Sequence, residues 1–299
     1  MPGKQVTELD ALPSFTDTSL LPVHNGAGLK KGLLSQLASY LGNKFSNPNL
    51  LINPDFKINQ RGKSTYSSTS SKKIYTVDRW NIYNVNLNAS TKVLTNPNSG
   101  SGQFKQTLEN PLVGTYTMTI KASRVSGNVH FFINENGANI IDKSIVSGLN
   151  TVTFTSTKGV SEVGVLISSG ASLQMDYVKL EQGTVATSYI APNPVEEYPK
   201  CQRYFQYISK LYCVPLIYTK SLINASDKFF QATNGNLPTE MRTKPTLTYK
   251  ALGQSDNSTF TGSASFELDS KSINTVTLDI AISNFTITIN AVNLDAEIY

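Results

Sequence analysis

Few residues in this chain are placed where they could carry out a reaction. Nucleophilic catalysis needs a base beside a serine or cysteine, and the sequence contains only two histidines, His24 and His130. His24 falls in a predicted turn near the N-terminus, and His130 precedes Phe131 in a predicted strand, where a lone histidine usually packs or faces solvent. No GxSxG nucleophile elbow is present. The histidines therefore give no support to a nucleophilic enzyme.

Two other catalytic signatures fail on spacing. Gly62-Lys63-Ser64 resembles the end of a phosphate-binding loop, but Lys57 stands where that loop needs its first glycine. Glycoside hydrolysis needs two carboxylates about 5–10 Å apart, and the 21 Asp and Glu residues are scattered. Asp78, beside Trp80, is the one carboxylate in an aromatic setting that could raise its pKa. The sequence predicts a protein that is not an enzyme, with a polysaccharide depolymerase as the catalytic alternative.

Cofactor sites are also not expected. The two cysteines, Cys201 and Cys213, are too few for a four-thiolate zinc site, and no CxxC motif is present. We expect them to be buried free thiols, with a disulfide as the alternative. Calcium would be compatible with a β sandwich, but no ligand run of the DxDxDG type occurs.

Composition excludes several classes of partner. The net charge is +5, yet the basic residues form pairs such as Lys30-Lys31 and not stripes, so no nucleic acid is expected as a ligand. No apolar run approaches the roughly 18 residues of a membrane span. The N-terminus lacks the apolar core of a signal peptide. We expect synthesis in the cytoplasm without Sec-type export, and no membrane insertion.

Residues 1–48 are predicted to form a small N-terminal arm. A strand over Leu20–Val23 is followed by a turn and then by a helix that Gly42 ends. The helix would carry leucines on one face, at Leu33, Leu34, Leu37 and Leu41. One helix and one strand cannot bury a core alone, so these leucines are the candidate contact with a larger assembly.

Residues 49–192 have the pattern of an antiparallel β sandwich. Within 114–122, apolar residues alternate with polar ones, as in a strand with one buried face, at Tyr116, Met118, Ile120 and Ala122. Four more strand-like runs follow, with glycine-containing turns roughly every ten residues. This spacing predicts a jelly roll.

Residues 193–215 are predicted to be a stiff linker with an aromatic helix. Pro192 and Pro194 restrict the backbone, and Glu196-Glu197 suits a first helical turn. Helical spacing then gives a stripe of Tyr204, Phe205 and Ile208, our candidate for packing between copies of the chain on a threefold axis.

Residues 216–299 are predicted to form a smaller β domain, in which Val276, Leu278 and Ile280 alternate with polar residues. A tight hairpin is expected at Ser283-Asn284. The fold class is therefore mainly β: an antiparallel jelly-roll sandwich, a short helix and a smaller C-terminal β domain, preceded by an arm.

Aromatic and amide residues in the sandwich are the candidate ligand site. A shallow groove could be lined by Tyr83, Asn84, Asn86 and Tyr116. The single tryptophan, Trp80, is either a core anchor or an exposed platform for a sugar ring.

Three sequence blocks resemble bacteriophage tail-fibre and receptor-binding proteins. They are NLLINPDFKINQRG (49–62), YTVDRW (75–80) and VKLEQGTVATSYIAPNPVEEYPKCQRYFQ (178–206). In that family the region is a jelly roll similar to carbohydrate-binding modules. Ile58 departs from the family pattern, which often has Trp there.

The resemblance implies a virion protein that forms homotrimers, binds host cell-surface polysaccharide and does not catalyse a reaction. It also implies that the N-terminal arm attaches the fibre to other virion structural proteins. A purely structural role, as a head fibre, capsid decoration or baseplate component, is the alternative.

Overall fold

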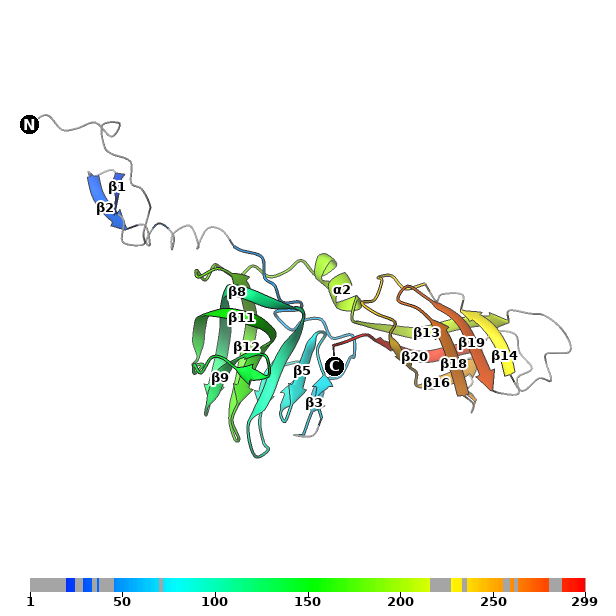
Figure 1. Ribbon diagram of the computed structural model, residues 1–299. Coiled ribbons are helices and arrows are strands. Elements are labelled where there is room, and N and C mark those ends of the chain that lie inside the picture. The colour runs from blue at the N-terminus through cyan, green and yellow to red at the C-terminus, as the bar shows by residue number, and fades with distance from the viewer. Residues whose placement is uncertain are drawn as a thin grey trace, which may run out of the picture.

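The computed structural model describes most of the chain in two β domains. The described residues are 20–24, 29–33, 37, 46–69, 72–215, 227–232, 236–254, 259–260, 263–279 and 287–298. Figure 1 shows the sandwich domain and the C-terminal domain side by side, with helix α2 at their junction. Among the described residues, no helix is long and apolar enough to cross a membrane.

The N-terminal arm contains a β hairpin of β1 (Leu20–His24) and β2 (Leu29–Leu33), which pair in antiparallel register with Leu20 opposite Leu33. The predicted strand at Leu20 is confirmed. The predicted helix is wrong at Leu33, because pairing with β1 satisfies the backbone of β2 and outweighs the helical spacing of the leucines. Leu37 is helical and 41% exposed. Leu34 and Leu41 lie outside the described residues.

The sandwich domain, which follows the arm, is a jelly-roll-like sandwich of antiparallel strands, as predicted. Its strands are β3 (Thr65–Ser67), β4 (Ile74–Tyr75), β5 (Trp80–Tyr83), β6 (Asn86–Asn88), β7 (Val93–Thr95), β8 (Gly102–Ser126), β9 (Val129–Glu135), β10 (Ala138–Asn139), β11 (Gly148–Ile167) and β12 (Ser172–Gln182). The strand predicted for 114–122 is confirmed and its four apolar side chains are buried, but Thr117 and Thr119 between them are buried as well, so both faces of this strand are covered.

Two long strands, β8 and β11, run through both layers of the sandwich. The first part of β8 pairs with β5, and the last part of β11 pairs with β9, in one layer. The second part of β8 pairs with β12 in the other layer, and β8 and β11 pair with each other in both. The strands change layer where their register shifts, near Gly114 (φ 118°) and Gly159 (φ 99°). A bend of this kind lets one strand serve two sheets.

The core of the sandwich is centred on Trp80, which is fully buried. Its ring is stacked on Phe104 at 4.8 Å between centroids, and Phe56 meets it edge-on at 5.0 Å. The indole N–H donates to the carbonyl of Asn53 at 2.9 Å. Trp80 is therefore a core anchor, and the alternative of an exposed sugar platform is wrong.

A buried lysine, Lys179, forms hydrogen bonds with both ends of the sandwich domain. The Lys179 ammonium lies 3.2 Å from a carboxylate oxygen of Glu181 and donates to Ser46 Oγ at 3.0 Å. It also donates to Thr187 Oγ1 at 2.5 Å and to the carbonyl of Ser188 at 3.1 Å. The chain therefore enters and leaves this domain at one place.

Helix α2 (Pro194–Gln202) is shorter than predicted. The side chain of Asn193 caps it by accepting from the Val195 N–H at 3.1 Å, and Glu196 and Glu197 occupy its first turn as expected. The helix ends before Tyr204, and strand β13 (Phe205–Pro215) follows. The predicted helical stripe is wrong, because Phe205 and Ile208 belong to β13 and pair with Asp295 and Val292 of β20 (Ile287–Asp295).

The C-terminal domain is one antiparallel sheet that includes β13. Its other strands are β14 (Asp227–Ala232), β15 (Thr246–Thr248), β16 (Ala251–Gln254), β17 (Thr259–Phe260), β18 (Ser263–Leu268), β19 (Ile273–Asp279) and β20. The sequence predicted that this domain starts at residue 216, but its sheet already begins at Phe205, the first residue of β13. Its core contains Leu211, Val276 and Ile289. The hairpin predicted at Ser283-Asn284 lies outside the described residues.

Cys201 is a buried free thiol, as predicted, and burial raises its pKa. The side chain of Cys213 lies outside the part of the chain that the structure describes.

Candidate functional site

A shallow hollow of about 390 Å³ opens on the outer face of β3, β6 and β7. The residues that line it are Thr65, Tyr66, Ser67, Asn86, Leu87, Asn88, Thr91, Val93 and Thr95. The volume falls within the range of about 300–1,000 Å³ that is typical of small-molecule sites.

The strand register arranges the polar side chains of this hollow in rows. Ser67 on β3 lies opposite Asn86 on β6, which lies opposite Thr95 on β7. The neighbouring row contains Thr65, Asn88 and the apolar Val93. Successive strand residues point to opposite faces, so the residues between these rows, such as Leu87, are buried in the core. The sheet therefore presents hydroxyl and amide groups on one open surface.

The hollow is neutral, and hydroxyl and amide groups line it together with apolar surface from side chains such as Val93. Its only ionisable side chain is Tyr66, which is buried and donates its hydroxyl to Asn59 Oδ1 at 2.6 Å; burial raises its pKa. Asn88 accepts from the backbone N–H groups of Ser90 and Thr91, each at 3.1 Å, through the same oxygen. These bonds fix the orientation of the Asn88 amide. Its NH₂ group makes no hydrogen bond to another described residue and could donate to a ligand. Such a surface suits a ligand rich in hydroxyl groups.

The structure does not bring the four predicted ligand residues together. Asn86 lines the hollow. Asn84 is buried, and its side-chain amide donates a hydrogen bond to the carbonyl of Ser99 at 2.9 Å. Tyr116 is buried against Phe154, with ring centroids 6.1 Å apart. Asn84 and Tyr116 therefore have structural roles, which corrects their assignment to a ligand groove.

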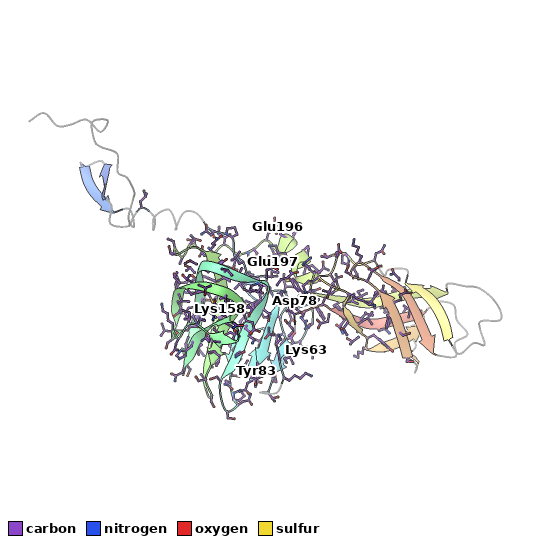
Figure 2. The ribbon with its side chains drawn as sticks, in the orientation of Figure 1. Lys63, Asp78, Tyr83, Lys158, Glu196 and Glu197 are labelled. Atoms are coloured by element: carbon purple, nitrogen blue, oxygen red, sulfur yellow. The ribbon has the colours of Figure 1, made fainter. Side chains whose placement is uncertain are left out.

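Tyr83 is partly exposed on β5, in the layer opposite the hollow, where it pairs with Gln103 of β8. Figure 2 shows it well away from Asp78 and helix α2. It therefore does not share a surface with Asn86.

Sequence reasoning missed most of the residues in the hollow. The polar members of short strands, such as Thr65, Ser67 and Asn88, flank a buried Tyr66 or Leu87. A polar-apolar-polar triplet in each strand is the signal that could have found them, but it is common in β proteins.

A second cluster of polar residues is buried where the two domains meet. Arg79 donates from Nη1 to Glu297 Oε2 at 2.6 Å and from Nη2 to the carbonyl of Thr107 at 2.6 Å. Its guanidinium lies 3.6 Å from the centre of the Tyr204 ring. Arg79 belongs to the sandwich and Glu297 to the C-terminal segment, so this ion pair joins the domains.

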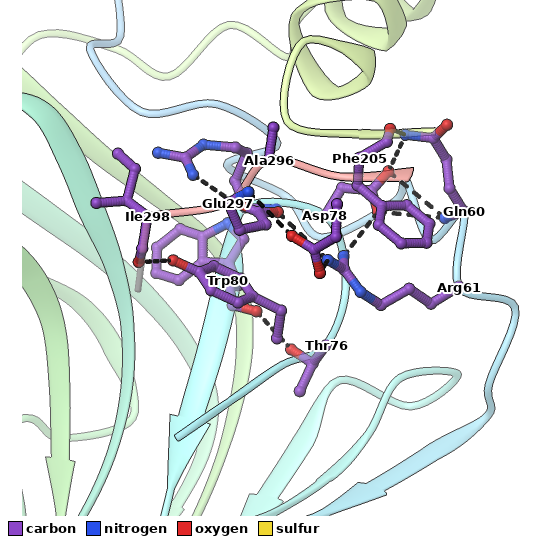
Figure 3. A network of polar contacts seen from close by, with 12 residues as sticks. Gln60, Arg61, Thr76, Asp78, Trp80, Phe205, Ala296, Glu297 and Ile298 are labelled. Atoms are coloured by element: carbon purple, nitrogen blue, oxygen red, sulfur yellow. Dashed lines mark hydrogen bonds and ion pairs between the residues drawn. The ribbon is translucent and has the colours of Figure 1, made fainter. Parts of the chain in front are cut away.

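Asp78 lies next to this ion pair and is fully buried (Figure 3). Its carboxylate accepts from Gln60 Nε2 at 2.8 Å and from Arg61 Nη1 at 3.4 Å. Burial is the main reason why the pKa of Asp78 is raised to about 7, and the Glu297 carboxylate raises it further. Because protein atoms cover it completely, Asp78 has no access to a bound substrate, which argues against a catalytic role.

The three residues assigned to a trimer interface are used within the chain. Tyr204 is buried and donates its hydroxyl to Glu109 at 2.6 Å. Phe205 is buried with the Arg61 guanidinium 3.9 Å from its ring centre. Ile208 packs partly buried against the core of the C-terminal domain. Tyr204 and Phe205 are thus used within the chain, at the junction between the domains, whereas a contact of Ile208 with another copy stays a prediction.

Among the described residues, no group of three or more His, Cys, Asp or Glu side chains could hold a metal ion. No family model matches the sequence, and no curated protein matches it. Among solved structures, the chain is similar to the carbohydrate-binding module TmCBM61 in complex with β-1,4-galactotriose. That similarity has 13% sequence identity and a TM-score of 0.27, and it covers 46% of this chain and 99% of the other. The ligand of this protein therefore has to be inferred from its own residues.

Proposed function

We propose that this protein is a non-catalytic fibre component of a bacteriophage virion that binds a neutral host cell-surface polysaccharide through the hollow on β3, β6 and β7. The observation that carries the glycan-binding proposal is the neutral lining of hydroxyl and amide side chains. The virion location and the attachment through the N-terminal arm rest on the resemblance of the sequence to tail-fibre proteins. Such a protein would be made in the host cytoplasm.

The lining favours a neutral sugar over a charged one. Hydroxyl and amide groups both donate and accept hydrogen bonds, which matches the alternating donors and acceptors of a sugar ring. The absence of a cation among the lining residues removes the charge-assisted bonds that an acidic sugar would need. The open shape allows a longer polymer to pass across the sheet with only a few sugar units in contact.

Weak binding at each hollow is consistent with this role if several copies act together. A shallow site of this kind typically gives millimolar affinity, about −4 kcal/mol. Linking sites in one particle raises the overall affinity by roughly 10²–10⁴ without any new contact. A homotrimer with several fibres per virion would supply that multiplicity.

The hollow is tested by replacing Asn86 and Asn88 with Ala together. We expect at least a tenfold loss of signal on an array of neutral bacterial surface oligosaccharides, because each lost hydrogen bond weakens binding by about 0.5–1.5 kcal/mol. The control is Asn128→Ala, an exposed asparagine outside the lining, which should bind like the wild type. Equal binding by all three proteins would exclude the hollow as the site.

The trimer is tested by light scattering of the full chain in solution. We expect a mass three times that of the 32.6 kDa chain. A mass of one chain at micromolar concentration would contradict the trimer while leaving the hollow untouched.

A structural virion component is the second candidate, and the buried ion pair between the domains favours it. Arg79 and Glu297 join the two domains, as a spacer would require. No binding to any oligosaccharide on the array, together with normal folding, would favour this role.

A further inference from the structure

The sheet that carries the hollow continues for two strands beyond it. Strand β12 pairs with β7, and β8 pairs with the other side of β12. The first row of the hollow runs from Ser67 through Asn86 to Thr95. Ser172 of β12 lies opposite Thr95 on one side and opposite Ser126 of β8 on the other. The first row therefore crosses five strands, with a hydroxyl or amide side chain on each of them.

The second row of the hollow continues in the same register. Gln174 of β12 lies opposite Val93 of β7 and opposite Arg124 of β8. The residues between the two rows, such as Leu94 and Leu173, are buried in the core, so both rows lie on the outer face. Because neighbouring strands are about 4.8 Å apart, each row is about 19 Å long. We call the two rows together, from β3 to β8, the polar track, and the hollow is one end of it.

The polar side chains at the far end of the track are available to a ligand. Arg124 and Ser126 are exposed, and Ser172 is partly exposed. Among the described residues, none of these three side chains has a hydrogen-bond or ion-pair partner. Elsewhere on the outer face, hydroxyl groups of β8 and β11 bond to each other, as those of Thr115 and Thr155 do at 3.0 Å. The track thus leaves to solvent the donors and acceptors that the same face pairs elsewhere.

The far end of the track adds donors of another kind. The guanidinium of Arg124 has several N–H groups in one plane, and these donate to the hydroxyl oxygens of a neutral sugar as well as to charged groups. Gln174 donates from Nε2 to the carbonyl of Thr91 at 3.0 Å, which fixes its amide beside the hollow. Both side chains are longer than the serines of the first row, so the second row forms a raised border along a low floor. An extended chain of hydroxyl-rich units fits this surface better than a single sugar does.

We propose that the polar track binds an internal stretch of a linear neutral polysaccharide, which runs across the strands from β3 to β8. This inference rests on the proposed glycan site in the hollow and extends it to Ser172, Arg124 and Ser126. The sugar units in the hollow supply part of the binding, and the units over β12 and β8 supply the rest. Oligosaccharides long enough to reach β8 therefore bind more tightly than short ones, which a site for a terminal sugar would not require.

The test is a competition series on the full chain. The neutral polysaccharide that gives the strongest array signal is immobilised, and its oligosaccharides of two, four and six sugar units compete for the protein. For the wild type, the six-unit oligosaccharide should inhibit at a concentration at least about tenfold lower than the two-unit one, because it makes additional hydrogen bonds. Arg124→Ala with Ser126→Ala should reduce this advantage to less than about threefold.

The matched control is Thr157→Ala with Lys158→Ala, which removes an exposed hydroxyl and an exposed cation outside the two rows and should keep the full advantage. Both double variants change exposed side chains and should fold. Equal inhibition by all three lengths, or an unchanged advantage in Arg124→Ala with Ser126→Ala, would overturn the track and leave the hollow in place. Unchanged binding by Asn86→Ala with Asn88→Ala, or no binding by the wild type, would refute the hollow and the track together.

Discussion

Replacing Arg79 with Met is expected to lower the free energy of unfolding by about 3–5 kcal/mol. The methionine retains much of the apolar stem but leaves the buried Glu297 carboxylate without the partner now 2.6 Å away. The Thr107 carbonyl would lose its hydrogen bond, and the Tyr204 ring would lose the guanidinium above it. Urea denaturation followed by circular dichroism measures the change.

A matched control separates burial from charge. Arg203 makes an ion pair with Glu109 at 2.7 Å, but its side chain is 45% exposed. Arg203→Met should therefore cost only about 0.2–1 kcal/mol. A loss as large as that of Arg79→Met would show that the ion pair at the junction is not special.

The double variant Arg79→Met with Glu297→Gln tests whether the unpaired Glu297 carboxylate causes the loss of stability. Removing the second charge relieves the main penalty of the first change, so the double variant should be less destabilised than the sum of the two single variants by more than about 1 kcal/mol. Simple additivity would mean that the two side chains act independently, contrary to their 2.6 Å contact.

Replacing Trp80 with Ala is expected to destabilise the protein by about 3–5 kcal/mol. The change empties the centre of the sandwich core, removes the stack on Phe104 and removes one of the two donors to the Asn53 carbonyl, leaving the Phe56 N–H as the other. Trp80→Phe fills most of the space and should cost about 1–2 kcal/mol. Circular dichroism is the suitable probe, because the variants lack the only tryptophan.

Tyr83→Ala serves as the control for this series, since Tyr83 is partly exposed on the same strand, β5. It should cost less than Trp80→Ala by at least about 2 kcal/mol. A loss of binding to oligosaccharides in Tyr83→Ala, with stability intact, would instead point to a ligand surface on the layer opposite the hollow.

The sequence predicted those elements whose cause is local. Alternation in 114–122 predicted a strand with Tyr116 and Met118 in the core, because successive side chains of a strand point to opposite faces; burial of Thr117 and Thr119 on the other face was not predicted. The start of helix α2 was also predicted, since Glu196 and Glu197 complement the positive end of the helix dipole.

The elements that depend on distant partners were not predicted. Phe205 and Ile208 have helical spacing, yet they lie in a strand because β20, at the other end of the C-terminal domain, supplies the hydrogen bonds. Asp78 stood out in the sequence for its aromatic neighbour, but the Glu297 carboxylate, which raises its pKa further, comes from the other end of the chain. A local pattern carries no information about such contacts.

In the candidate site, too, features with a local cause were predicted and features that depend on distant strands were not. Asn86 was predicted, but Asn88 and Thr65 were not, because only the register of β3 against β6 brings their side chains to one surface. Asn84 and Tyr116 have the residue types of a sugar site, and burial removes them from it.

The bonds of Lys179 decide how the molecule would bear tension. A pull between the N-terminal arm and the C-terminal domain reaches the sandwich at Ser46 and leaves it near Ser188, and Lys179 holds both points. The force would run through this short bridge of hydrogen bonds on β12 and through the Arg79–Glu297 ion pair between the domains. Strands β3, β6 and β7 contain none of these load-bearing contacts, so the hollow on them would keep its shape while the chain is under tension.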